Sequence, residues 1–282
     1  MANTLITPTN VARAALATYQ YSAVLPMVCN RTFVNEFGGG SGDTITIRKQ
    51  ASLTASLFDR ATGVVAQNIT EGSITLTVGD LYDVSAHITQ EQWDLDLADF
   101  SFQVAEPMGK AMVRKAEQLI ATELETVTPA APGAALLTDI VAARSSLTAA
   151  EVPADSRVLV VGSDVAAALI TNDNLIKADQ AGDANALRNA QIGRLFGMPV
   201  VESVVLDAKN GYIVHKDALT LVSITPQVPR GAANASVQSF DGQAMRVVFD
   251  YDAVKKQDLV SADAYLTAKI IRAEGIAGVS IA

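Results

Sequence analysis

The sequence has little of the chemistry on which enzymes and metalloproteins depend. It contains one cysteine, Cys29, and two histidines among 282 residues. A single cysteine excludes an intrachain disulfide and suits a reducing compartment. His87 and His215 lie far apart in the chain, and neither has a cysteine or carboxylate at metal-ligand spacing. We therefore expect no metal ion, no cofactor and no catalytic histidine.

Basic charge and long apolar runs are also scarce. Lysine and arginine number 21 against 30 aspartates and glutamates, which gives a net charge of −9. This balance excludes a basic nucleic-acid footprint over the whole chain, and it fits ordinary solubility or a surface that must not adhere to nucleic acid. No run reaches the roughly 18 apolar residues of a membrane span, and we expect no signal peptide.

Motifs for nucleotide binding and catalysis are incomplete. The glycines of Gly38–Gly42 could begin a phosphate loop, a Rossmann fingerprint or a nucleophile elbow, but Asp43 stands where each needs a further glycine. Asp250 and Asp252 share one face of an expected strand, yet no cleft is evident for a glycosidase pair. We expect these two carboxylates to pair with the lysines that follow them, and we expect no enzymatic activity.

The sequence does contain an N-terminal segment without acidic residues. Residues 1–35 include Arg13 and Arg31 but no aspartate or glutamate. Positions 10–28 fit an amphipathic helix that ends near Pro26. We interpret this segment as an arm that packs on a neighbouring subunit, with contact to nucleic acid as the alternative.

An extended two-stranded arm is expected next. After Gly38–Gly42, Ile45 and Ile47 alternate with polar residues, which predicts a strand with one apolar face. A partner strand is expected from residue 73 and should continue to Ile88, whereas the residues between the two strands have little apolar pattern. Because a lone two-stranded arm is marginally stable in water, it should lie on another surface.

A long amphipathic helix is predicted at 106–127. Apolar residues recur on one face at helical spacing, and Pro107 should begin this helix or kink a longer one. Upstream, Thr89–Gln92 reads as a capping box. Three aspartates follow it: Asp94, Asp96 and Asp99. They could hold a divalent ion, but favourable charge at a helix N-terminus is the better interpretation.

A break at Pro129–Gly133 separates this helix from an α/β segment. Within that segment we expect a helix, a strand and a helix at 134–149, 157–161 and 164–170, and a polar loop to residue 186. Ser163 is expected to cap the second of these helices. Two later strands are expected at 245–252 and 264–274, joined by a polar loop.

The most diagnostic stretch is 192–203. Gly193, Gly197 and Pro199 should end a preceding helix and turn the chain into a core strand. A second strand, a polar turn and an apolar run follow at 212–222. This pair, at this spacing, resembles the axial domain of tailed-phage major capsid proteins, which have the Hong Kong 97 fold.

The resemblance covers nearly the whole chain. Gly42–Arg48 looks like the start of the extended loop in the coat proteins of short-tailed Salmonella phages, although 282 residues leave no room for the inserted domain of those proteins. The resemblance implies an α+β fold with four parts. These are an N-terminal arm at 1–36, an extended β-loop at 37–86, a peripheral domain with a long spine helix at 87–128 and 240–282, and an axial domain at 129–239.

The same resemblance implies a container and not a catalyst. Pentamers and hexamers of one chain would form the icosahedral shell around the double-stranded DNA of a tailed phage. Scaffolding and portal proteins would be partners, DNA would be contacted non-specifically, and assembly in the host bacterial cytoplasm would precede residence in the virion capsid. An encapsulin-like nanocompartment shell is the main alternative, and an α/β enzyme using the end of the 158–162 strand is a third.

Assembly requires inter-subunit contacts and hinges. We expect basic residues of the extended loop to pair with acidic residues of a neighbouring subunit, for example the aspartates after Gln92. The residues expected in inter-subunit contacts are Arg13, Arg48, Lys49, Arg60, Asp94, Asp96 and Asp99. The residues expected to act as hinges are Gly39, Gly40, Pro107 and Gly133. Gly193, Gly197 and Pro199 are expected to set the axial-domain turn.

Overall fold

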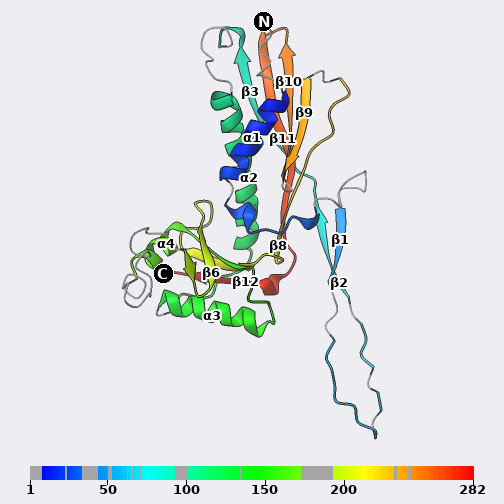
Figure 1. Ribbon diagram of the computed structural model, residues 1–282, viewed down its shortest axis with the longest axis vertical. Helices are drawn as coiled ribbons and strands as arrows, with labels where there is room; N and C mark the ends of the chain where they lie inside the picture. Colours follow the sequence, from blue (N-terminus) through cyan, green and yellow to red (C-terminus); the bar gives the residue numbers. More distant parts are fainter. Residues whose placement is uncertain are drawn as a thin grey trace.

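Two helices lie along one face of a five-stranded antiparallel sheet (Figure 1). The helices are α1 (Pro8–Ser22) and α2 (Glu106–Glu125). The strand order is β3-β11-β10-β9, and β8 pairs with the last residues of β11. The strands are β3 (Leu81–Thr89), β8 (Leu219–Ile224), β9 (Asn234–Phe240), β10 (Gln243–Asp252) and β11 (Gln257–Ile270). The computed structural model describes residues 8–22, 24–33, 44–49, 53–61, 63–64, 66–69, 71–92, 101–133, 135–172, 193–231, 234–240 and 243–282.

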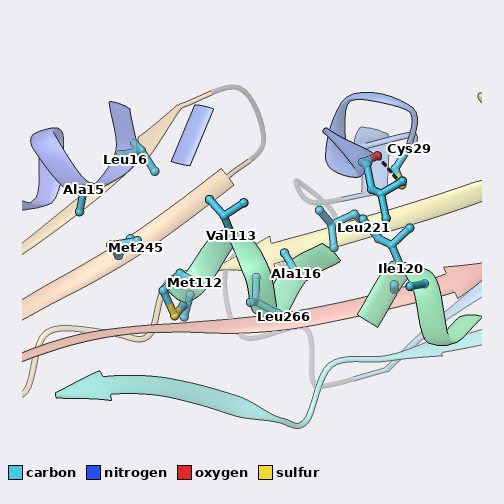
Figure 2. Packing of buried hydrophobic residues seen from close by; sticks show 14 of the residues in the cluster. Ala15, Leu16, Cys29, Met112, Val113, Ala116, Ile120, Leu221, Met245 and Leu266 are labelled. Carbon is cyan, nitrogen blue, oxygen red and sulfur yellow. Dashed lines mark hydrogen bonds between the residues drawn. The ribbon is translucent and has the colours of Figure 1, made fainter. Parts of the chain in front are cut away.

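The core between helices and sheet follows from two periodicities. Apolar residues three or four apart share one face of α2, and the buried ones include Met108, Met112, Ala116, Ile120 and Leu124. Alternate residues of β10 and β11 face the helices, and the buried ones include Met245, Val247, Val260, Ala262, Ala264 and Leu266. Figure 2 shows side chains from α1, α2, β8, β10 and β11 meeting in this core. The helix predicted at 106–127 and the strand predicted at 245–252 are confirmed.

The start of α2 agrees with the sequence signals. Pro107 lies in its first turn, where a missing N–H costs no helical hydrogen bond, and a π-helical turn, η4 (Ser101–Ala105), leads into it. Upstream, the Thr89 N–H donates to Gln92 Oε1 at 3.0 Å, and the Gln92 N–H donates to Thr89 Oγ1 at 3.3 Å. These reciprocal bonds confirm the capping box.

The N-terminal helix belongs to the core of its own subunit. The side chains that α1 buries against α2, β9 and β10 are Val11, Ala12, Ala15 and Leu16. α1 ends at Ser22, and a 3₁₀ turn, η1 (Leu25–Met27), follows it. The predicted helix is confirmed, but the prediction that it ends near Pro26 is wrong, because α1 ends at Ser22. Its apolar face is covered within the subunit, and the contact of the arm with a neighbouring subunit stays a prediction for its other residues.

A buried carboxylate holds the chain where it leaves α1. Glu117 lies on α2, and its side chain points into the space between α2 and η1. Its Oε1 accepts hydrogen bonds from the N–H groups of Val24, at 2.8 Å, and Leu25, at 3.3 Å. N–H groups at the start of a helical turn have no partner within that turn, so a charged acceptor stabilises η1 in this position.

Cys29 lies in the same core and leads to a testable pH dependence. Its thiol donates to the Leu25 carbonyl at 3.5 Å (Figure 2), and burial raises its pKa from 9.0 to about 12. The unfolded chain ionises this thiol near pH 9.0, so its contribution to stability is complete below that pH and is lost as the pH rises towards about 12. Urea denaturation across this range should show a steeper loss of unfolding free energy in the wild type than in Cys29→Ala. Equal slopes would contradict the prediction.

The extended arm is a separate two-stranded sheet. β1 (Thr44–Lys49) and β2 (Gly72–Thr77) pair antiparallel, as the sequence predicts. Leu76 and Val78 are buried together with Val222 of β8, and this cluster attaches the base of the arm to the main sheet. The loop between the two strands projects well away from the rest of the molecule (Figure 1).

The partner strand does not continue to Ile88 as predicted. β2 ends at Thr77, and β3 begins at Leu81 in the large sheet. Gly79 and Asp80 lie between them, and both residue types are disfavoured in strands. The alternation from Tyr82 to Ile88 is real, but its apolar residues face α2 and not the arm.

A second, mixed sheet forms a lobe beside the C-terminal end of α2 (Figure 1). Its strand order is β12-β7-β4-β6-β5, with β4 and β6 parallel and the other neighbours antiparallel. The strands are β4 (Arg157–Val161), β5 (Arg194–Leu195), β6 (Met198–Glu202), β7 (Asn210–His215) and β12 (Ile276–Ser280). Helices α3 (Leu136–Ala149) and α4 (Ser163–Ile170) pack on it through an apolar cluster.

The prediction that Ser163 caps α4 is wrong. Gly162 is the N-cap, and no side chain caps this helix. Instead, the backbone carbonyl of Ala208 accepts the N–H groups of Asp164, at 3.0 Å, and Val165, at 3.3 Å. A loop that is distant in sequence thus satisfies the helix N-terminus that a nearby serine could have satisfied.

The return strands differ from the prediction in two ways. β11 begins at Gln257 and not at residue 264, because the presumed polar loop contains alternating apolar residues that pair with β10 and β3. β12 pairs with β7, although all of 240–282 was expected beside the long helix. β9 has no counterpart in the prediction, since its sequence of small and polar residues carries a weak strand signal.

Candidate functional site

The described residues contain no cluster of histidine, cysteine, aspartate or glutamate that could hold a metal ion. His215 accepts the Asp217 N–H at 3.3 Å, and His87 meets the Gln257 amide at 3.2 Å. Both histidines therefore have local structural contacts. No helix among the described residues has the length and apolar character needed to cross a membrane.

The carboxylates at the end of β10 shape a turn. Asp252 Oδ1 accepts the N–H groups of Val254, at 2.9 Å, and Lys255, at 3.2 Å. Asp250 Oδ1 accepts the Tyr251 N–H at 2.9 Å. The prediction that the two aspartates pair with the lysines after them is wrong, because Asp252 accepts from the backbone of the turn and Asp250 from the backbone of β10.

The tip of the extended loop is the most distinctive surface of the molecule. This loop tip comprises the described residues between 53 and 69, and its large apolar side chains are exposed: Leu53, Leu57, Phe58, Val64 and Ile69. Leu57 is 98% exposed and Phe58 is 61% exposed. Contiguous exposed apolar side chains on a soluble protein mark an interaction surface.

Short-range hydrogen bonds hold the loop tip in its extended form. The Gln67 side chain reaches across the loop, where its Oε1 accepts the Thr54 N–H at 3.1 Å and its Nε2 donates to the Thr54 carbonyl at 2.5 Å. Farther out, the Gly63 N–H donates to the Asp59 carbonyl at 2.8 Å. The apolar side chains are thus presented on an ordered backbone, which lowers the ordering cost of binding.

The basic residues expected in inter-subunit contacts lie apart from one another. Arg60 is exposed on the loop tip, and Arg13 is exposed on α1. A terminal nitrogen of Arg48 lies 3.9 Å from Glu71 Oε2, just before β2, in a solvent-exposed pair of little energetic consequence. Lys49 ends β1. The expected acidic partners lie outside the described residues: Asp94, Asp96 and Asp99.

The residues expected to act as hinges lie in different structural environments. Gly39 and Gly40 lie outside the described residues. Pro107 follows the π-helical turn described above. The Gly133 N–H donates to Asp139 Oδ2 at 2.9 Å, and a Cβ at this position would meet the same carboxylate at 2.2 Å. A side chain at position 133 would therefore displace the Asp139 carboxylate, which here joins the chain to the first turn of α3.

The described part of the stretch at 192–203 forms a β-hairpin of β5 and β6. Leu195 of β5 pairs with Met198 of β6, and the two residues between them make the turn. Gly197 has φ +82°, a conformation that glycine adopts without strain. Pro199 lies within β6 opposite Arg194, so it does not end a helix as expected. The expected preceding helix lies outside the described residues.

Two surface features escaped the sequence reasoning. The apolar residues of the loop tip were passed over because they show no regular period, although five large apolar side chains in a segment without pattern are themselves a signal of an interaction surface. Phe196, in the turn between β5 and β6, was not singled out. Its position carried no sequence signal, because a two-residue hairpin usually has Asn, Asp or Gly before the glycine.

Comparison with known proteins agrees with this architecture. The sequence matches the family described as phage capsid protein over residues 82–262, which is more than half of the chain. A comparison with curated proteins gives no match.

Solved structures with the same fold include several phage capsids. A structure from Mycobacterium phage Che8 has a TM-score of 0.73 and 22% sequence identity, covering 92% of this chain and 91% of that chain. The capsid of cyanophage P-SCSP1u has a TM-score of 0.64 and 14% identity, covering 86% of this chain and 84% of that chain. A virus-like particle from Pyrococcus furiosus has a TM-score of 0.59 and 11% identity, covering 96% of this chain and 98% of that chain. The chain therefore belongs to the phage capsid protein family, and it is a major capsid protein with the Hong Kong 97 fold that assembles into the shell of a virion.

Proposed function

We propose that the extended loop of each subunit lies on an adjacent subunit and that the completed shell encloses the double-stranded DNA of a tailed phage. The observation that carries the proposal is the exposed apolar loop tip, whose large apolar side chains are not covered within the subunit and whose two sides are linked by the Thr54–Gln67 hydrogen bonds. A projecting two-stranded arm is marginally stable alone and gains stability when it is covered. In a homo-oligomeric shell the covering surface is another copy of the chain.

Charged residues of the extended loop indicate which surface of the neighbouring subunit it contacts. The loop tip carries Arg60, and its base carries Arg48 and Lys49, whereas the chain as a whole has a net charge of −9. Basic side chains of the loop that meet acidic side chains of a neighbour have complementary potential, which favours the correct register of the contact. Asp94, Asp96 and Asp99 remain our candidate partners, and Arg13 on α1 is a further candidate contact.

We also assign four parts to the subunit. Residues 1–36 are the arm, 37–86 the extended loop, 87–128 with 240–282 the peripheral domain, and 129–239 the axial domain, except that the pairing of β12 with β7 supports moving 276–280 into the axial domain. Gly39, Gly40, Pro107 and Gly133 are the proposed hinges between these parts. Gly193, Gly197 and Pro199 shape the proposed axial-domain hairpin.

The partners follow from the same proposal. We infer kinship with the coat proteins of short-tailed Salmonella phages, without their inserted domain. A separate scaffolding protein and a portal protein complete the assembly in the host bacterial cytoplasm, and packaged DNA is contacted without sequence specificity. The chain acts as a structural protein without enzymatic activity. Negative-stain microscopy of the wild-type chain, expressed alone and together with the scaffolding protein, tests the proposal, since uniform icosahedral shells support it and a persistent monomer under both conditions contradicts it.

Changes at the loop tip should prevent assembly and spare the fold. Arg60→Glu reverses a charge at the contact, and the pair Leu57→Ser with Phe58→Ser removes its apolar area. Because these side chains have no intrachain core contacts, we expect an unchanged unfolding temperature but few or no shells by sedimentation and microscopy. Lys216→Glu, an exposed charge reversal in the turn after β7, is the matched control. Normal shell yield from both loop variants would refute the role of the loop.

A further inference from the structure

Phe196 has a backbone conformation that its side chain disfavours. It is the first of the two turn residues between β5 and β6, with φ +50°, and Gly197 follows with φ +82°. Positive φ at both central residues of a two-residue hairpin is the type I′ arrangement, in which the first position prefers Asn, Asp or Gly. A bulky residue with positive φ is a true outlier, and such strain concentrates at functional positions.

The strain is not relieved by burial of the ring. The residues on either side, Leu195 and Met198, are buried in the apolar cluster of this lobe, so both ends of the turn are anchored. Phe196 itself is 42% exposed at the tip. Within the described subunit, this residue combines an unfavourable backbone with an exposed aromatic ring. Asparagine in its place would remove both disadvantages.

We propose that Phe196 is an anchor that inserts into an apolar pocket of a second copy of this chain in the assembled shell. The hairpin is at the free edge of its sheet, because β5 is the last strand and pairs only with β6 among the described residues. The exposed Arg194 lies beside it on β5. Aromatic and arginine side chains are enriched in the residues that dominate binding at interfaces.

We choose a second copy of this chain as the partner of Phe196 because the shell is built from copies of one chain. A shell built from one chain surrounds each subunit with copies of itself, and heterologous contacts between them place a projecting residue of one copy in a pocket of the next. The anchored turn fixes the backbone that carries the aromatic ring before contact, so less backbone freedom is lost on binding. The inference therefore rests on the proposed function and adds a second contact, distant from the extended loop.

The substitution Phe196→Asn tests the proposal, because it should increase the stability of the subunit and weaken the assembly of the shell. Asn-Gly is the favoured type I′ pair, so the unfolding temperature of the isolated subunit should rise by a few degrees. The concentration needed for shell assembly should increase by about tenfold or more, as expected for loss of an interface anchor. Phe196→Tyr, which keeps an aromatic ring, should assemble like the wild type.

A photo-crosslinking amino acid at position 196 identifies the protein that Phe196 contacts. In assembled particles we expect a covalent dimer of this chain, with the crosslinked peptide mapped by mass spectrometry. Assembly of Phe196→Asn at the wild-type concentration, or crosslinking solely to a different protein, would overturn the inference while leaving the shell function intact. A wild-type chain that forms no shells at all would overturn both.

Discussion

Replacing Arg246 with methionine is expected to lower the free energy of unfolding by about 3–5 kcal/mol, because it leaves a buried carboxylate without its partner. Arg246 of β10 lies directly opposite Asp263 of β11. Its Nε donates to Asp263 Oδ1 at 2.8 Å, and a terminal nitrogen donates to Oδ2 in a bidentate pair. The Asp263 side chain is 8% exposed and the Arg246 side chain 13%, so water cannot replace the lost partner.

The double variant Arg246→Met with Asp263→Leu distinguishes a costly orphan charge from a favourable ion pair. Removing both charges eliminates the desolvation cost of each, so most of the lost stability should return. One loss remains, because Arg246 also donates to the Gln227 carbonyl at 2.5 Å and so ties the loop after β8 to the sheet. Urea denaturation of the wild type, both single variants and the double variant gives the coupling energy. A double variant as unstable as Arg246→Met alone would contradict this expectation and show that the pair itself stabilises the sheet.

The parts of the fold that were predictable from the sequence are those in which one face of an element is buried. The helical spacing of Met108, Met112 and Ile120 identified α2, because each of these residues has to face the same core. The alternation of Met245 and Val247 identified β10 for the same reason. In both elements a local pattern reports a contact made within the subunit.

The parts of the fold that were not predictable depend on which strands and loops pair with one another across long stretches of the chain. β2 and β3 both alternate, but the sequence does not show that Gly79 and Asp80 divide them between two sheets. β12 pairs with β7 across a long stretch of chain, and the carbonyl that caps α4 comes from Ala208. Such pairings are decided by tertiary packing, which overrides local propensity.

The candidate interfaces were still harder to predict, for a different physical reason. A side chain that is covered only after assembly, such as Leu57 or Phe58, resembles any exposed apolar residue when one subunit is considered. Exposure on an ordered loop tip, and positive φ at Phe196, become visible only in three dimensions. The charged residues proposed from sequence remain candidates, since charge alone does not specify a partner.

The contact between α1 and α2 depends on the absence of a side chain at Gly109. A Cβ at this position would lie 2.4 Å from the carbonyl oxygen of Ala15 on α1, and the nearest other atoms are also backbone atoms of Ala15. Neither helix can relieve such a contact by rotating a side chain. The two helices would have to move apart, although buried residues of both share one apolar cluster.

Gly109→Ala is therefore expected to destabilise the subunit by about 2–3 kcal/mol, the usual cost of overpacking a core. The sign is informative, because alanine in place of glycine within a helix would otherwise stabilise it by about 1 kcal/mol. Gln118→Ala, at an exposed position on the same helix, is the matched control and should change little. Limited proteolysis should cut first in α1, because that helix loses its packing against α2, whereas α2 keeps its contacts with the sheet. A stabilised Gly109→Ala variant, with α1 cut as readily in the wild type as in the variant, would mean that the N-terminal helix is not part of the subunit core in solution, and the arm would then be free to pack on a neighbour.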